Sequence, residues 1–306
     1  MTLLRIGTRG SRLALWQATF VADRLRALAP ARAIDIVEIE TAGDQVRDVP
    51  LPALGGEGVF TKEIQRALLG GTVDVAVHSL KDLPTTPVAG LTLAAVPPRG
   101  PAGDVFVSQR FRRFDDLPHA AVVATGSLRR QSQALYRRPD LQLVNIRGNV
   151  ETRLRKLADD PLDALILAQA GLERLGLTEA VTEILDQQWM LPAVGQGALG
   201  LECRADDLQT LEIVAKLDDF GSRSAVLAER ALLRALGGGC QVPIGAAASL
   251  EAGRLTLRAA VLSPDGAKRI ESRHEGEPAT AELLGEQLAQ RLKKLGAVRL
   301  LAGDRA

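Results

Sequence analysis

Short apolar segments with strand character alternate along this chain with longer amphipathic segments that have helical periodicity. The first of these predict a strand at residues 3–7, a helix at 11–29 and a strand at 34–40. The later ones are strands at 73–77, 121–124, 141–146, 164–167 and 199–202, and helices at 61–69, 127–136, 149–158, 206–217 and 222–236. Regular alternation of this kind is typical of an α/β fold. The chain is therefore predicted to be an α/β protein.

Two clusters of proline and glycine interrupt the pattern, at residues 97–103 and 191–197. We expect hinges at these clusters, where the chain leaves one α/β lobe, builds a second and returns to the first. The resulting divisions are lobe one at 1–97 plus 198–217, lobe two at 103–191 and a small α+β C-terminal domain at 218–306. The predicted elements of that last domain are strands at 244–250, 254–262 and 267–272 and a helix at 279–295.

Composition excludes several classes of protein. Apolar residues make up 46% of the chain, which rules out wholesale disorder, and no apolar stretch approaches the length of a membrane span. A net charge of +1 gives no overall field that would attract nucleic acid. Two cysteines give no disulfide framework, and the first residues lack the pattern of a signal peptide. We therefore expect a cytoplasmic protein without a nucleic-acid or membrane partner.

One of the two cysteines follows a run of three glycines. Gly237–Gly239 lead directly into Cys240, and Pro243 stiffens the segment that follows. Glycine has no Cβ, so this loop allows a large group to approach the sulfur atom closely. The other interpretation is a glycine that ends the preceding helix, followed by an incidental cysteine. The local sequence leaves these two interpretations about even.

Arginines follow several predicted strands, next to residues that begin helices. Ser11, Ser127 and Asn149 are good N-caps, and Arg9, Arg129, Arg130, Arg147 and Arg153 lie beside them. Helix starts bind anions through unpaired N–H groups, whereas an arginine there opposes the helix dipole. Repeated arginines at such positions predict a cleft for a ligand with several anionic groups. Phosphates and carboxylates both remain possible, although no Gly-Lys-Ser/Thr phosphate loop occurs.

A polar segment, residues 78–84, follows the strand predicted at 73–77. Ligand sites of α/β proteins lie at the carboxyl ends of parallel strands. Asp82 is therefore a candidate functional carboxylate, although a surface ion pair with Lys81 also explains it. The three histidines, His78, His119 and His274, are isolated from one another and from the cysteines, so no metal site is expected.

Taken together, these segments resemble the porphobilinogen deaminase (hydroxymethylbilane synthase) family over essentially the whole chain. The motifs that carry the resemblance occur in the family's order at residues 8–18, 78–84, 126–131, 147–150, 191–200 and 238–245. It implies two periplasmic-binding-protein-like lobes with mixed sheets and a third domain that carries a cofactor. It also implies a transferase of porphyrin (haem-type tetrapyrrole) biosynthesis. Four porphobilinogen units are joined head to tail, with loss of ammonia, onto a covalent dipyrromethane, and water then releases hydroxymethylbilane.

The resemblance also assigns roles to residues. It implies that Cys240 holds the dipyrromethane through a thioether and that Asp82 is catalytic. The positions implied to bind cofactor or substrate are Arg9, Ser11, Ser79, Lys81, Thr125, Ser127, Arg129, Arg130, Arg147, Gly148, Asn149, Arg153, Arg174 and Gln196. The partners implied are porphobilinogen and the growing oligopyrrole, and the family association favours a monomer. One departure is Glu57, because the family's glycine-rich loop often has lysine there.

Two other classes of function compete with this interpretation. One is a two-lobed anion-binding protein without chemistry, in which Cys240 is incidental. The other is a thiol-redox protein that uses Cys240 and Cys203, although no Cys-x-x-Cys motif occurs and the apolar context of Cys203 predicts burial. The mass of the intact protein separates the three classes, because only a deaminase carries a covalent dipyrromethane.

Overall fold

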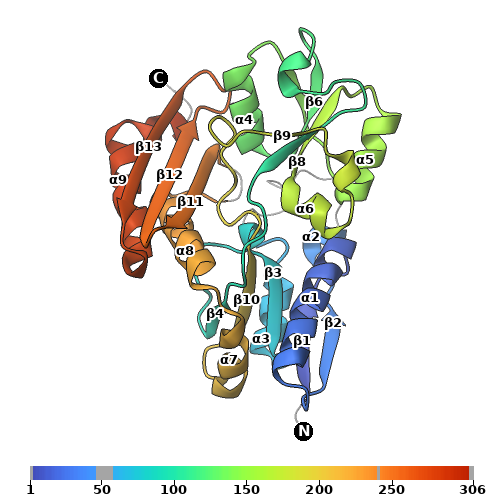
Figure 1. Cartoon of the computed structure of the whole chain (residues 1–306), viewed down its shortest axis with the longest axis vertical. Coiled ribbons are helices and arrows are strands. Elements are labelled where there is room, and N and C mark those ends of the chain that lie inside the picture. The colour runs from blue at the N-terminus through green and yellow to red at the C-terminus, as the bar shows by residue number, and fades with distance from the viewer. Residues whose placement is uncertain (1–2, 46–57, 240–241, 303–306) are drawn as a thin grey trace. The chain divides into compact units, whose positions relative to one another are not determined.

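The computed structural model describes residues 3–45, 58–239 and 242–302. The chain forms two compact units, Met1–Gly100 with Ala198–Arg223 and Pro101–Gly197 with Ser224–Ala306. Each unit contains a five-stranded sheet, and the second unit also contains a three-stranded sheet. Figure 1 shows the elements of both units along the chain.

The sheet of the first unit is mixed, with the strand order β2-β1-β3-β10-β4. Its strands are β1 (Leu4–Thr8), β2 (Ile34–Glu38), β3 (Val75–Ser79), β4 (Leu91–Ala95) and β10 (Leu199–Arg204). The first three strands run parallel, and β10 pairs antiparallel with both β3 and β4. Because β10 runs in the opposite direction, it begins at the edge where the parallel strands end.

Helices cover both faces of this sheet. They are α1 (Arg12–Leu28), α2 (Ala42–Gln45), α3 (Lys62–Leu69) and α7 (Leu208–Val214), with short 3-10 turns η2 (Leu80–Asp82) and η5 (Ala215–Leu217). Successive residues of β3 point to opposite faces. Val75 and Val77 therefore pack with α1 and α7, while Ala76 packs with α3.

The first sheet of the second unit has a closely similar plan, with the order β7-β6-β8-β5-β9. Its strands are β5 (Asp104–Val107), β6 (Val122–Ala124), β7 (Gln142–Val144), β8 (Ala164–Ala168) and β9 (Glu183–Ile184). Strands β6, β7 and β8 are parallel, and β5 is antiparallel to β8. The helical elements are η3 (Phe114–Asp116), α4 (Leu128–Arg137), α5 (Val150–Asp159), α6 (Gln169–Arg174) and η4 (Thr178–Ala180). Helix α4 packs on one face of the sheet, and α5 and α6 pack on the other.

The remaining sheet is antiparallel, with the order β11-β12-β13. Its strands are β11 (Ile244–Glu251), β12 (Arg254–Leu262) and β13 (Arg269–Gly276), and its helical elements are α8 (Phe220–Ala235), η6 (Pro278–Thr280), α9 (Ala281–Lys294) and α10 (Ala297–Ala302). Side chains from one face of this sheet form a core with α8 and α9.

These sheets confirm the predicted fold class, a mixed α/β protein with a small α+β part at the C-terminal end. The predictions missed β4, β5 and β9 and the helices α2, α6 and α10. The division into three domains with hinges at 97–103 and 191–197 stays a prediction.

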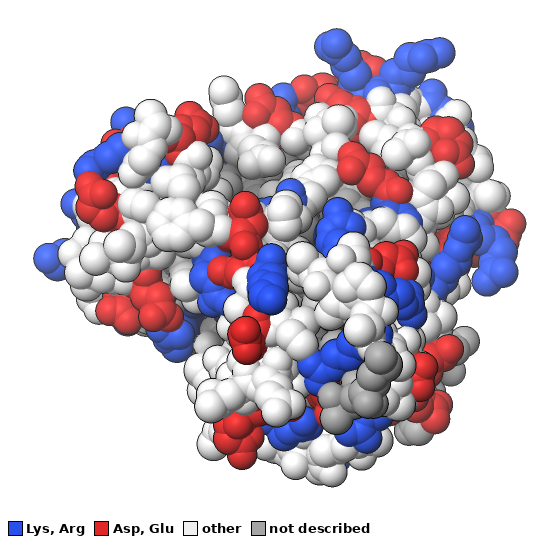
Figure 2. Space-filling model, turned by 60° about the horizontal axis from the view of Figure 1, so that its bottom comes forward, with Lys and Arg blue, Asp and Glu red and all other residues white. Residues whose placement is uncertain are grey.

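Figure 2 shows lysine and arginine side chains interspersed with aspartate and glutamate on the face drawn, without a broad region of one sign. In the described parts of the chain, every helix is too short or too polar to cross a lipid bilayer.

Candidate active site

Several of the predicted site residues follow strands at one edge of each five-stranded sheet. In the first unit, Arg9 follows β1 and Lys81 and Asp82 follow β3. In the second unit, Ser127 follows β6 and Arg147 follows β7. The parallel strands place their carboxyl ends together, so each sheet gathers these side chains at the edge where α/β proteins bind ligands.

Arg9 is held by an acidic and an aromatic neighbour. Its Nε lies 3.1 Å from a carboxylate oxygen of Asp44, and its guanidinium lies 4.1 Å from the ring centroid of Phe60. Thr41 also donates a hydrogen bond to Asp44. Burial acts to raise the pKa of Asp44, but the hydrogen bonds from Arg9 and Thr41 outweigh it, so this pKa lies below its ordinary value. Arg9 is therefore oriented before any ligand binds.

Two hydroxyl groups of the first unit also have partners within the protein. Ser11 is the N-cap of α1, and its Oγ accepts a hydrogen bond from the backbone N–H of Ala14. Ser79, at the end of β3, exchanges hydrogen bonds with the amide of Gln17 at 2.9 and 3.2 Å. Gln17 is almost completely buried in α1, so it fixes the hydroxyl of Ser79 at the edge of the sheet.

Asp82 differs from its neighbours, because its carboxylate has no ion pair or hydrogen bond with any residue in the described ranges. It is half-buried at the end of the turn η2, three residues beyond β3. In β3, His78 Nε2 lies 3.0 Å from a carboxylate oxygen of Glu202 on β10, and both side chains are buried. The surface ion pair between Asp82 and Lys81, considered from the sequence, is therefore not formed.

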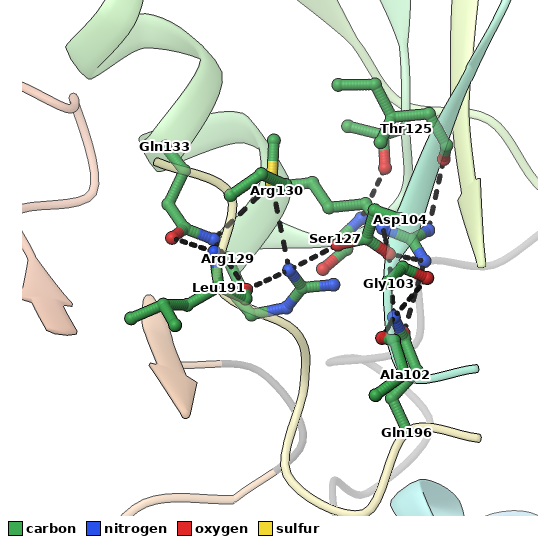
Figure 3. Close-up of polar contacts among 12 residues, drawn as sticks. Ala102, Gly103, Asp104, Thr125, Ser127, Arg129, Arg130, Gln133, Leu191 and Gln196 are labelled. Carbon is green, nitrogen blue, oxygen red and sulfur yellow. Dashed lines mark hydrogen bonds and ion pairs between the residues drawn. The ribbon is translucent and has the colours of Figure 1, made fainter. Parts of the chain in front are cut away.

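The second unit contains a buried cluster of two arginines around one aspartate (Figure 3). Arg129 Nη1 lies 2.7 Å from one carboxylate oxygen of Asp104, and Arg130 donates to the other from Nε at 3.0 Å and Nη2 at 2.8 Å. Asp104 is fully buried, and both arginines are nearly so. The three side chains together carry one net positive charge. We call Arg129, Arg130 and Asp104 the arginine cluster.

The segment 191–197 is tied to this cluster. Arg129 Nη1 donates to the Leu191 carbonyl at 2.6 Å, and Gln133 donates to the same oxygen at 3.0 Å. Gln196 donates to the Ala102 carbonyl at 2.7 Å and to Asp104 at 2.8 Å, as Figure 3 shows. Gln196 therefore joins the two segments predicted to be hinges, which gives its buried side chain a structural role within this unit.

Electrostatics hold the arginine cluster in its ionised form. Burial acts to raise the pKa of Asp104, but the charges of Arg129 and Arg130 and their hydrogen bonds outweigh it, so this pKa lies well below the ordinary value. Burial lowers the pKa of Arg129, and Asp104 partly offsets that effect. The Nε of Arg129 is buried without a hydrogen-bond partner among the described residues. An anionic group there would neutralise the net positive charge of the cluster and accept a hydrogen bond from Arg129 Nε.

The turn between β7 and α5 presents a further unpaired arginine donor. Arg147 is half-buried, and its Nη1 is buried without a hydrogen-bond partner in the described part of the chain. Gly148 has a φ of +117°, and a Cβ there would lie 2.6 Å from a side-chain carbon of Thr152. Asn149 caps α5 through the N–H of Thr152, and Arg153 Nε donates to the Gly148 carbonyl. The turn is thus fixed by its own contacts, and Arg147 Nη1 has no partner among the described residues.

Arg174, Thr125 and Ser127 complete the predicted set in this unit. Arg174 ends α6 and donates to the Gly197 carbonyl at 2.5 Å. Burial lowers the pKa of Arg174 to about 10, with Glu173 acting in the opposite direction, so it stays charged at neutral pH. Thr125 Oγ1 accepts a hydrogen bond from the N–H of Ser127. Ser127 is the N-cap residue of α4, although its side chain makes no capping hydrogen bond.

The structure describes only one of the two cysteines, Cys203. Cys240 and Glu57 lie outside the described residues, so their predicted roles stay predictions. Cys203 is completely buried in the core of the first unit, which confirms that prediction. Burial raises the pKa of its thiol to about 12, which leaves it protonated and unreactive at neutral pH. No cluster of histidine, cysteine or acidic residues suited to a metal occurs in the described ranges.

The sequence analysis missed three residues that organise these groups, namely Asp104, Asp44 and Gln17. Asp104 directly follows the Pro/Gly cluster at 97–103, where polar residues are expected in a loop. It begins β5, opposite the last residue of β8, and that pairing brings it to the edge where β6 and β8 end. The available signal was the repeated presence of arginine at helix starts, because buried guanidiniums require an anionic partner.

Two models of one protein family match most of the chain. The family model described as "Porphobilinogen deaminase, dipyromethane cofactor binding domain" matches residues 4–212, and "Porphobilinogen deaminase, C-terminal domain" matches residues 224–294. The chain belongs to the porphobilinogen deaminase family. This membership confirms the predicted transferase of porphyrin biosynthesis and its dipyrromethane cofactor.

Relatives of this chain match it over nearly their full length. The porphobilinogen deaminase of Desulforudis audaxviator is 52% identical over 98% of this chain and 97% of its own. That of Syntrophotalea carbinolica is 50% identical over 98% and 95%, and that of Pelotomaculum thermopropionicum is 49% identical over 97% and 96%.

Solved structures that align with the chain are more distant. The methionine binding protein MetQ aligns with a TM-score of 0.46 and 12% identity over 70% of this chain and 89% of its own. A lipoprotein from Bacillus subtilis aligns with a TM-score of 0.44 and 10% identity over the same shares.

Proposed function

We propose that this chain joins four porphobilinogen units head to tail on a dipyrromethane attached to Cys240, with Asp82 as the catalytic carboxylate. The observation that carries the proposal is the state of Asp82. It is a half-buried carboxylate at the end of the turn η2, which follows β3, and it has no ion pair or hydrogen bond with the described residues. Its negative charge is therefore available to a substrate beside the fixed hydroxyl of Ser79.

The residues of each unit fit a group that carries several carboxylates. Dipyrromethane bears acetate and propionate side chains, and when bound it supplies the free pyrrole carbon to which units are added. Arg147 and the arginine cluster provide buried, unpaired N–H donors and spare positive charge, which carboxylates satisfy through charge-assisted hydrogen bonds. Arg9, Ser11, Lys81, Arg153 and Arg174 are proposed to assist in holding the same kind of group.

The proposal also covers the location, the oligomeric state and the binding partners of the protein. We place it in the cytoplasm as a monomer that binds porphobilinogen and the growing oligopyrrole, with neither nucleic acid nor membrane as a partner. The mixed charge on the face shown in Figure 2 and the net charge of +1 are in keeping with a small-molecule enzyme.

The mass of the intact protein tests this function directly. We expect the wild-type chain to carry one covalent dipyrromethane and Cys240→Ala to fold without any adduct and to make little product. Cys203→Ala is the matched control, because its thiol is buried in the core, and it should keep the adduct. An unmodified wild-type chain would favour the anion-binding protein, and a reversible thiol change would favour the redox protein. A normal adduct on Cys240→Ala would contradict the attachment site.

A second prediction concerns Arg147. Truncating one partner of a buried charge pair typically costs about 2–5 kcal/mol, because the other charge is left unpaired. Arg147→Leu should therefore reduce cofactor loading or slow turnover by at least tenfold, measured by intact mass and by the rate of product formation. Arg254→Leu is the control, since Arg254 forms an exposed ion pair with Glu277. Equal loading and turnover in the two variants would reject a carboxylate-binding role for Arg147.

A further inference from the structure

The turn between β12 and β13 contacts the helix that carries Arg129 and Arg130. Gly266 lies in this turn with a φ of +73°, and it is buried although the neighbouring turn residues are exposed. A Cβ there would lie 2.6 Å from Leu135 Cβ, 2.7 Å from the Ser132 carbonyl oxygen and 2.8 Å from the Tyr136 nitrogen, all on α4. The approach is thus backbone to backbone, which only glycine allows.

A side chain of α4 also reaches this turn. The Oγ of Ser132, which is fully buried, lies 2.8 Å from the Leu128 carbonyl oxygen of its own helix and 3.2 Å from the Pro264 carbonyl oxygen. The turn itself is fixed, because Ser263 and Lys268 are joined by backbone and side-chain hydrogen bonds and Gly266 donates to the Ser263 carbonyl. In Figure 1, α4 lies beside the end of β12 and β13 from which this turn emerges.

The three-stranded sheet also contacts residues 188–192, which include the Leu191 carbonyl that accepts a hydrogen bond from Arg129. Arg269 donates to the Trp189 carbonyl at 2.8 Å, and Arg258 donates to the Gln188 carbonyl at 2.7 Å. Leu191 packs against the side chains of β12, and the Pro192 carbonyl accepts from the N–H of Ala246 on β11. The C-terminal sheet therefore contacts both the helix from which Arg129 extends and the carbonyl that its guanidinium binds.

From these contacts we propose that the β12–β13 turn is a positioning element for the arginine cluster, with Gly266 as its essential residue. A rigid antiparallel hairpin sets the position of α4, and the contacts to residues 188–192 set the position of the Leu191 carbonyl. Arg129 bridges these two supports, so a shift of α4 would move its guanidinium relative to Asp104 and Leu191. The inference rests on the proposed role of Arg129 and Arg130 in binding the carboxylates of cofactor and substrate.

Gly266→Asn tests this inference, with Gly253→Asn as its matched control. Asparagine tolerates a positive φ better than other residues with a Cβ, so the variants chiefly differ in the space around them. Gly253 lies in the β11–β12 turn at a φ of +76°, and a Cβ there meets nothing within 4 Å. Both variants are made in the full chain and compared by hydrogen exchange of residues 128–137, cofactor occupancy by intact mass, and kcat/KM.

We expect faster exchange in α4, lower cofactor occupancy and a loss of roughly ten- to a hundredfold in kcat/KM for Gly266→Asn alone, since small displacements of positioning groups have effects of this size. Unchanged exchange in α4 would overturn the inference, as would faster exchange with normal occupancy and kcat/KM. Arg129→Leu is measured alongside, to distinguish the positioning role of the turn from the carboxylate-binding role of Arg129. Normal turnover in Arg129→Leu would contradict the proposed role of the arginine cluster in binding carboxylates, and hydrogen exchange in α4 would then be the test of whether the turn positions this helix.

Discussion

Asp82→Asn is expected to fold, to keep its cofactor and to lose most of its turnover. Stabilisation of a developing charge and proton transfer by a positioned carboxylate each contribute roughly 10²–10⁴-fold to a rate. The substitution preserves the shape of the side chain and one hydrogen-bond acceptor but removes the charge. We therefore expect kcat to fall by at least about a hundredfold, measured as product formed per cofactor-loaded enzyme.

The physical reason lies in the charge that the substrate acquires. Loss of ammonia from porphobilinogen leaves an electron-poor species whose positive charge is shared with the pyrrole nitrogen. A carboxylate beside that N–H stabilises the cation and accepts a proton during coupling. No arginine can replace it, because a guanidinium is cationic and does not deprotonate. Asp82 suits this task because its charge is not neutralised by a partner among the described residues.

Two further variants sharpen this test. Asp82→Glu retains the charge one methylene out of place, so weak but measurable turnover is expected. Asp35→Asn removes a carboxylate from an exposed position on β2 and should leave turnover unchanged. If Asp82→Asn turns over like Asp35→Asn at equal cofactor occupancy, Asp82 has no catalytic role.

The local features of the fold follow from the sequence. Amphipathic periodicity located α1, α4 and α8, and the β-branched run at 73–77 located β3. N-cap chemistry placed the starts of α1 and α5 correctly, because Ser11 and Asn149 each bind an N–H of the first turn. These elements depend on interactions between residues that are close in the chain, so a single sequence contains the information needed to predict them.

The partners of the arginines could not be predicted in this way. Arg130 and Asp104 are 26 residues apart and meet only because β5 pairs with β8 in a sheet whose order the sequence does not reveal. Arg9 and Asp44 are 35 residues apart, and their side chains meet beyond the carboxyl ends of β1 and β2. Repeated arginines at helix starts predicted an anionic ligand, which stays a prediction. Arg9, Arg129 and Arg130 instead pair with carboxylates of the protein itself in the described residues.

Asp104, the carboxylate of the arginine cluster, is expected to stabilise the fold. Asp104→Asn should lower the free energy of unfolding by about 3–5 kcal/mol, because it leaves two buried guanidiniums without a counter-charge. Urea unfolding of Asp104→Asn in a Cys240→Ala background measures this loss without any contribution from bound cofactor. Asp115→Asn is the control, since Asp115 forms an exposed ion pair with Arg137, also on α4, and should change stability by no more than about 1 kcal/mol.

The pH dependence of this loss identifies its cause. The pKa of Asp104 in the folded chain lies well below its ordinary value, which is about 4 in the unfolded chain. The carboxylate therefore stabilises the fold fully above the ordinary value, and that contribution disappears as the pH falls through the lower folded value. The difference in the free energy of unfolding between Asp104→Asn and the same chain with Asp104 intact should be constant from neutral pH down to about 5. It should shrink below about pH 4. A difference that persists unchanged at low pH would mean that lost packing, rather than the unpaired charge of Arg129 and Arg130, causes the destabilisation.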